Sequence, residues 1–270
     1  MKLGVLSLKK RVLKVFLYIV FLGSILGATG YHFYYYGNEE ESEELYKKME
    51  QVVEQQKEVL HEAAKEQIQE QEVPEKRKKE TNEEENPCLD IKDMKNINED
   101  IYAWIEIPDT EIAYPVLTSP KEDYYLMHNV NHSYGYPGCI YSNPENGVDL
   151  ASELTVLYGH NMKNGSMFGT LNNFLQESYF KGHPYIYIYT EDKVNVYEIV
   201  AAVKWKDKNL LKEYNAKGSE GMEWFCNTFF NGKEENCRKA EFCEESKFLT
   251  LSTCVRGQKE KRMLVIGVLK

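Results

Sequence analysis

From Asn98 to Lys270 the chain consists of short β-type runs separated by turns and loops. The clearest run is Tyr185–Tyr189, where tyrosine and isoleucine alternate with the period of two that a strand requires. We predict eight strands, at residues 103–107, 112–117, 138–143, 154–159, 185–190, 195–203, 248–254 and 263–269. Many short strands joined by turns favour a closed barrel. The predicted fold class is therefore mainly β.

Two helices are expected beside this barrel. One covers Ser166 to Gln176, with Ser166 as its N-cap. The other lies near Glu220–Phe230, inside a long polar insertion at residues 204–247 between the sixth and seventh strands. A connection of this length usually has a function of its own.

The N-terminal part has the composition of a membrane anchor. Residues 15–36 form an uncharged run of 22 residues. As a helix this run would be about 33 Å long, enough to cross a bilayer core of about 30 Å. Basic residues in the flank at 1–14 and tyrosines at the far end predict a single-pass anchor with a cytoplasmic N-terminus and an extracellular remainder. The alternative is a cleaved signal peptide with its small-residue site at Ala28–Gly30.

Residues 37–86 are dominated by charge. They contain 17 acidic and 8 basic residues, which accounts for most of the net charge of −10. Leu45, Val52 and Val59 recur every seven residues, which suggests a helix with a thin apolar seam. Three positions are too few to favour a coiled-coil dimer. We therefore expect a solvated helical or disordered stalk that holds a domain at residues 87–270 off the membrane.

The composition argues against two classes of ligand. Outside the membrane flank, basic residues cluster at residues 76–79, which acidic residues surround, so no nucleic-acid partner is expected. The region of residues 226–243 lacks a Cys-x-x-Cys spacing and a neighbouring histidine, so neither zinc nor another cofactor is expected. The six cysteines are Cys88, Cys139, Cys226, Cys237, Cys243 and Cys254. An exported chain could pair some of the first five.

Cys254 is the strongest candidate for a reactive group. It closes one predicted strand, and Arg262 opens the next. If these strands pair antiparallel, the two residues lie opposite each other, roughly 5 Å apart. A fixed cation stabilises the thiolate, which is the nucleophilic form of cysteine. Arg256 is a competing arginine, but we place it in the flexible connection. The alternative for Cys254 is a packed core cysteine.

His160 is the candidate base. It follows the β-type run Leu154–Tyr158 and a glycine, so it lies just past a strand end, where catalytic groups are often found. The other five histidines occupy less suitable segments: His32, His61, His128, His132 and His183. The alternative for His160 is a surface or hydrogen-bonding histidine.

Three segments with candidate site residues follow one another along the chain. They are Leu157–Met162 with its Gly-His pair, Thr250–Cys254 with the sequence Thr-Leu-Ser-Thr-Cys, and the pair Lys261–Arg262. Together they resemble the sortase family of Gram-positive bacteria, and the serine before Thr-Cys resembles class B. The resemblance runs from about Asn98 to Lys270. Further segments that contribute to it are Trp104–Pro108, Tyr114–Val116 and Tyr124–Leu126.

The resemblance implies a sortase-type eight-stranded barrel with peripheral helices. It also implies a catalytic trio of His160, Cys254 and Arg262. Class B sortases carry a helix in the connection at residues 204–247, which we expect to wall the substrate groove. Ser252 shares the face of its predicted strand with Cys254, and Ser252 and Thr253 are candidate substrate contacts; the alternative for Ser252 is a simple strand-edge hydroxyl.

The activity that the resemblance implies is peptide transfer. The Cys254 thiolate would attack the carbonyl before the scissile bond in the C-terminal sorting signal of an exported protein, forming a thioester. His160 would protonate the leaving amine. Arg262 and a backbone N–H near Val255 would stabilise the oxyanion. An amine of a cell-wall precursor or a pilin would then resolve the thioester.

Two other functions remain open from the sequence. The same three residues could serve a hydrolytic cysteine peptidase, with water as the acceptor. A catalytically silent, membrane-tethered binding module is the third possibility, although an intact trio argues against it. The sorting motif depends on the shape of the groove and is not legible from the sequence. The same holds for the choice between anchoring haem-uptake proteins and building pili.

Overall fold

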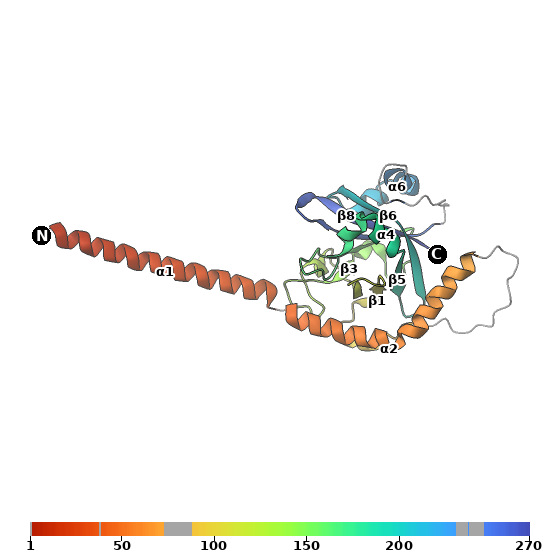
Figure 1. The fold of residues 1–270 in the computed structure, drawn as a ribbon, viewed down its shortest axis with the longest axis horizontal. Helices are drawn as coiled ribbons and strands as arrows, with labels where there is room; N and C mark the ends of the chain where they lie inside the picture. Colours follow the sequence, from red (N-terminus) through yellow and green to blue (C-terminus); the bar gives the residue numbers. More distant parts are fainter. Residues whose placement is uncertain (1, 38, 73–87, 231–236, 238–245) are drawn as a thin grey trace.

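The structure is a computed structural model that describes residues 2–37, 39–72, 88–230, 237 and 246–270. Its centre is a closed β-barrel, from which one long helix extends (Figure 1). The strands are β1 (Ile101–Glu106), β2 (Ala113–Thr118), β3 (Ile140–Ser142), β4 (Leu154–Tyr158), β5 (Tyr185–Tyr189), β6 (Val194–Lys206), β7 (Phe248–Val255) and β8 (Gln258–Leu269). The eight-stranded barrel predicted from the sequence is confirmed.

The barrel follows the order β1-β2-β3-β4-β7-β8-β6-β5, and β5 pairs with β1 to close it. Two neighbouring pairs are parallel, β2 with β3 and β4 with β7. The β4–β7 pair matters most, because parallel strands end at the same edge of a sheet. Leu249 and Leu251 of β7 point into the main core, as their alternation predicts.

The β7–β8 hairpin differs from the prediction. We expected Arg262 to open the second strand, after a connection of seven residues at 255–261. The turn is shorter, at Arg256 and Gly257, and β8 begins at Gln258, so Arg262 lies inside a strand. The polar residues 259–261 were mistaken for a loop because they have no apolar pattern. They extend β8 because the end of β6 pairs with them, with Lys206 opposite Lys261.

The helix predicted at Ser166–Gln176 is wrong. The chain there forms turns, followed by the 3₁₀ helix η3 (Leu171–Leu175) and the short helix α4 (Glu177–Gly182). Met167, inside the predicted helix, has φ 54°, in the left-handed region that interrupts an α-helix. Other short elements are α3 (Lys92–Ile97), η1 (Tyr124–Leu126), η2 (Pro144–Asn146) and η4 (Gly218–Glu220).

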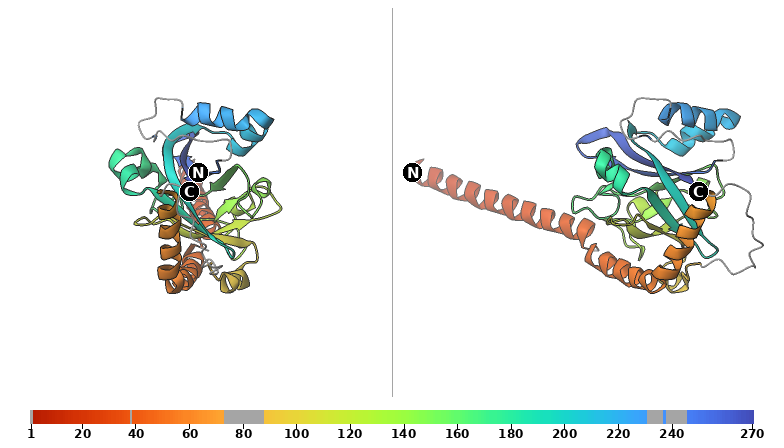
Figure 2. Two further views of the ribbon diagram at one scale, coloured as in Figure 1. Left: turned by 90° about the vertical axis from the view of Figure 1, so that its right-hand side faces the viewer. Right: turned by 45° about the vertical axis from the view of Figure 1, so that its right-hand side comes forward.

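The long insertion carries the predicted helix, α6 (Gly221–Phe229), and a further short helix, α5 (Leu210–Asn215). Phe225 and Phe229 of α6 are buried in a second apolar cluster against the outer face of the barrel. The two further views place α6 and helix α2 (Glu39–Glu72) on opposite sides of the barrel (Figure 2). Residues 231–236 and 238–245 of the insertion, among them Cys243, lie outside the described part of the chain.

The acidic segment does not behave as a free stalk where it is described. Residues Glu39–Glu72 form helix α2, which packs across β2 and β6. Its buried side chains follow a helical stripe: Ser42, Tyr46, Met49, Val53, Leu60 and Ala64. Of the expected seam, Leu45 and Val52 are partly buried against the core, whereas Val59 is 61% exposed and Leu60 beside it is 1% exposed. Residues 73–86, the rest of the expected stalk, lie outside the described part of the chain.

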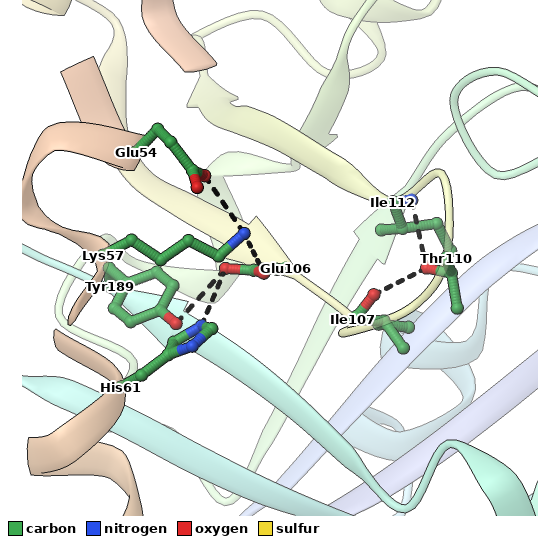
Figure 3. Close-up of polar contacts among 8 residues, drawn as sticks. All are labelled: Glu54, Lys57, His61, Glu106, Ile107, Thr110, Ile112 and Tyr189. Carbon is green, nitrogen blue, oxygen red and sulfur yellow. Dashed lines mark hydrogen bonds and ion pairs between the residues drawn. The ribbon is translucent and has the colours of Figure 1, made fainter. Parts of the chain in front are cut away.

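A buried carboxylate helps to hold α2 against the barrel (Figure 3). Glu106 at the end of β1 accepts contacts from two residues of α2, Lys57 at 3.3 Å and His61 at 3.4 Å. Tyr189 of β5 donates its hydroxyl to the same carboxylate at 3.3 Å. Because a buried carboxylate without partners is strongly unfavourable, these contacts make α2 part of the folded body.

Helix α1 (Lys2–Tyr36) projects away from this body (Figure 1). Among the described residues, one helix near the N-terminus is long and apolar enough to cross a membrane. Its apolar side chains, such as Phe16, Leu22 and Leu26, are exposed. An exposed apolar helix of this kind is expected where lipid surrounds the chain.

Candidate active site

The parallel pairing of β4 with β7 brings the predicted base and nucleophile to one edge of the barrel. Tyr158 and Ser252 are register partners at the end of this ladder. Gly159 donates its N–H to the carbonyl of Ser252, which extends the pairing beyond β4. His160 and Cys254 each lie two residues past that register pair. Adjacent strands are about 4.8 Å apart, so the parallel pairing brings the backbones of His160 and Cys254 close together.

Cys254 lies at an irregularity of β7. Its register partner is Arg262, as the sequence predicted, but the next pair along the ladder is Val255 with Gln258. This bulge leaves three extra residues on β8. Bulges bend a strand and redirect its side chains. Cys254 is the exposed residue of an otherwise buried strand, so its thiol is accessible.

Arg262 is directed at the thiol. Its Nη1 donates a hydrogen bond to Cys254 Sγ. Its Nη2 contacts Asp207 Oδ1 at 2.8 Å. Arg256, the competing arginine, lies in the hairpin turn and is exposed. The register of β8 therefore brings Arg262, and not Arg256, opposite Cys254. This is the antiparallel pairing that the sequence predicted.

His160 is held by backbone groups around it. Its Nε2 lies 2.7 Å from the carbonyl oxygen of Leu126. Its own carbonyl accepts the N–H of Phe168 at 2.9 Å. The preceding Gly159 has no room for a side chain, since a Cβ there would lie 2.4 Å from Ile140 and 2.8 Å from Phe168. A glycine is therefore required where β4 turns into the His160 segment.

The contact with Leu126 defines the tautomer of His160. A carbonyl oxygen can only accept a hydrogen bond, so Nε2 carries a proton. The nitrogen left to gain and lose a proton is Nδ1. Burial lowers the pKa of His160, the hydrogen bond with Leu126 partly opposes this, and the positive charge of Arg262 lowers it further. The neutral imidazole is therefore favoured near neutral pH.

Side-chain hydrogen bonds tie strand β7, which carries Cys254, to the His160 segment and to η3. Asn161 Nδ2 donates to the carbonyl of Cys254 at 2.8 Å, and Asn172 Nδ2 donates to the same oxygen at 3.4 Å. Thr253 Oγ1 donates to the carbonyl of Gly159 at 2.7 Å. No role was predicted for Asn161 or Asn172. Asn161 could have been suspected because it follows His160, whereas Asn172 carries no local signal.

The three predicted residues line one groove of about 340 Å³. Tyr141 and Tyr158 form part of its wall, with ring centroids 5.5 Å apart. Asp123 accepts the hydroxyl of Tyr141 at 2.9 Å. The N-terminal end of the insertion, here called its entrance, contributes Asp207, Lys208 and Asn209 to the groove. The insertion thus borders the groove, as expected from its length.

The two predicted substrate contacts, Ser252 and Thr253, are largely buried. Ser252 and Thr253 both line the groove but are 7% and 3% exposed. The Thr253 hydroxyl already donates to Gly159. The backbone N–H of Val255 stays a prediction as an oxyanion donor. Among the described residues, no group of three or more His, Cys, Asp or Glu side chains could hold a metal ion.

Comparisons with known proteins agree with this architecture. The family model of the sortase domain matches residues 105–270. Sortase B of Listeria monocytogenes is 29% identical over 194 residues, covering 67% of this chain and 74% of that protein. A mutant form of Clostridium perfringens sortase B has 30% identity and a TM-score of 0.61, covering 66% of this chain and 85% of its own.

A class B sortase of Streptococcus pyogenes involved in pilus biogenesis has 25% identity and a TM-score of 0.58. The similarity covers 67% of this chain and 98% of that one. The matched region includes all eight strands except the first residues of β1 for the family model. The chain therefore belongs to the sortase family and is a class B sortase.

Proposed function

We propose that this enzyme transfers peptides through a thioester on Cys254, with His160 as the proton donor and acceptor and Arg262 as the oxyanion donor. As a sortase, the chain is a cysteine transpeptidase that acts on sorting-signal substrates. The assignment of the three residues rests on one observation. Arg262 donates to the Cys254 sulfur inside the groove that His160 also lines.

In the first half-reaction the Cys254 thiol gives its proton to Nδ1 of His160, and its sulfur forms a bond to the carbonyl carbon before the scissile bond. The electrons of the carbonyl move to its oxygen, where Arg262 donates a hydrogen bond. When the carbonyl re-forms, the carbon–nitrogen bond breaks and Nδ1 of His160 gives its proton to the leaving amine. The products are a thioester on Cys254 and a released C-terminal fragment.

In the second half-reaction an acceptor amine attacks the thioester. Nδ1 of His160 takes a proton from the attacking nitrogen, the new amide forms, and the Cys254 sulfur leaves. We propose that the donor is an exported protein with a C-terminal sorting signal. The acceptor is the amine of a cell-wall precursor or of a pilin, and the solved class B relative that is involved in pilus biogenesis supports including the second.

We further propose that residues 15–36 anchor the enzyme as a single membrane pass. The N-terminal basic flank at 1–14 would stay in the cytoplasm and the domain at 87–270 would lie outside the cell. The family is membrane-associated in Gram-positive bacteria, and α1 is exposed and apolar. The packing of α2 on the barrel supports treating residues 39–72 as part of the extracellular body.

Product analysis tests the proposal. The full-length enzyme in detergent is incubated with a sorting-peptide library, with and without an added amine such as triglycine. Transpeptidation predicts a ligated product that contains the added amine and is missing from the C254A variant. Cleavage that yields only the free acid at every amine concentration would instead indicate a hydrolytic peptidase. Cleavage that survives in C254A would exclude Cys254 as the nucleophile.

A further inference from the structure

The guanidinium of Arg262 is held on two sides. Nη1 donates to Cys254 Sγ, and Nη2 lies 2.8 Å from Oδ1 of Asp207. Since a guanidinium is planar and rigid, fixing one of its terminal nitrogens fixes the direction of the other. The carboxylate of Asp207 therefore determines where the N–H groups that face Cys254 point.

Asp207 is itself fixed to the strand that carries Arg262. It directly follows β6, and its backbone N–H donates to the carbonyl of Glu260 in β8 at 2.8 Å. Trp205, two residues earlier, is the β6 register partner of Arg262. The backbone that bears the carboxylate and the backbone that bears the guanidinium thus belong to one ladder.

Without this carboxylate Arg262 would have more freedom. Its side chain is 32% exposed, and an arginine in such a place has several rotamers available. Asp207 is 43% exposed, so the ion pair is screened by water and contributes little to folding stability. The ion pair is therefore better explained as a contact that orients the Arg262 guanidinium than as one that stabilises the fold.

We propose that Asp207 is a positioning residue for the transfer reaction, acting through Arg262. This inference rests on the proposed function of Arg262 as the oxyanion donor. Asp207 belongs to the insertion side of the groove, so the same contact also fixes the entrance of the insertion beside Cys254. Movement of this entrance would turn the guanidinium away from the developing negative charge.

The test is a double-mutant cycle on the full-length enzyme, with turnover of a sorting peptide as the readout. D207N keeps the shape of the side chain but removes its charge, and we expect kcat to fall about 10- to 100-fold, as for a small misplacement of a catalytic group. KM and the thermal midpoint should change little. D207E, which keeps the charge, should recover part of the loss. In an R262A background, D207N should have no further effect.

A matched control lies next to Asp207. Glu213 pairs with Lys206 and Lys208, the two neighbours of Asp207 in the chain. E213Q therefore removes ion pairs from the same segment without a contact to Arg262, and it should keep wild-type kcat.

The outcomes distinguish the positioning role of Asp207 from the proposed role of Arg262 as the oxyanion donor. If R262A loses activity but D207N does not, the positioning role is wrong and the proposed function stands. If D207N lowers kcat equally in the wild-type and R262A backgrounds, Asp207 acts independently of Arg262 and the inference is overturned. If R262A is fully active, the role of Arg262 in the proposed function fails, and the inference fails with it.

Discussion

His160 and Cys254 lie the same two residues beyond the Tyr158–Ser252 register pair of parallel strands β4 and β7. This relationship explains how residues 94 positions apart in the sequence reach one groove. Parallel strands place equivalent ends at one edge of the barrel, so a two-residue extension of β4 brings His160 to the edge where Cys254 lies in β7. The antiparallel partner β8 then adds Arg262 from the other side of Cys254.

Replacing Arg262 should remove transition-state stabilisation. R262A is expected to lower kcat by about 10²–10³, the usual effect of losing one oxyanion donor. R262K keeps the charge but not the two-sided fork, so it should recover only part of the activity. R256A is the control, because Arg256 lies in the exposed turn, and it should retain wild-type turnover in the same peptide assay. Equal losses in R262A and R256A would contradict a specific role for Arg262.

The pKa of His160 should respond to Arg262. Burial lowers this pKa, and the positive charge of Arg262 adds to the lowering. R262A removes that charge, so the pKa should rise and the imidazole should protonate at higher pH. R262K should keep it near the parent value. NMR titration of the ring nitrogens in a C254A background measures both, and Nδ1 should be the nitrogen that titrates. A fall in the pKa in R262A would contradict the assigned electrostatics.

Helix α2 should contribute to folding stability. Leu60 is 1% exposed, and L60A should lower the free energy of unfolding by about 2–4 kcal/mol through lost burial and a cavity. V59A is the matched control, since Val59 is 61% exposed and its truncation should cost under about 0.5 kcal/mol. Denaturant unfolding monitored by fluorescence compares the two. Equal stability of both variants would mean that α2 is a free spacer.

The hydroxyl of Thr253 should stabilise the backbone around the site rather than bind the substrate. It donates to the carbonyl of Gly159, so T253V should lower the free energy of unfolding by about 1 kcal/mol and leave KM unchanged. T253S keeps the hydroxyl and should resemble the parent. A rise in KM for T253V, without a loss of stability, would instead favour the direct substrate contact that the sequence suggested.

The barrel was predictable because each of its strands carries its own local signal. Alternation in Tyr185–Tyr189 and the apolar run at the end of β8 locate strands without reference to the rest of the chain. The start of β8 was missed because residues 259–261 are polar, and only their pairing with β6 makes them a strand. The helix predicted at Ser166–Gln176 was wrong because Met167 takes a left-handed conformation, which composition alone does not reveal.

The site was predictable as far as its chemistry depends on residue type. Cys254 and His160 have distinctive side chains near strand ends, and the pairing of Cys254 with Arg262 followed from the register of the hairpin. The Leu126 carbonyl could not be predicted, because every residue carries one and only the fold brings this one to His160. Asp207 is distant in the sequence from Arg262, and a surface aspartate has no local signature.

Trapping and mapping the acyl-enzyme tests the proposed chemistry most directly. Full-length enzyme is mixed with a sorting peptide, quenched in acid, digested, and examined by mass spectrometry. We predict a substrate fragment attached to the sulfur of Cys254, released by hydroxylamine and missing from C254A. The H160A and R262A variants should accumulate it more slowly than the parent. Substrate cleavage without an adduct on Cys254, or with an adduct on another cysteine, would contradict the proposal.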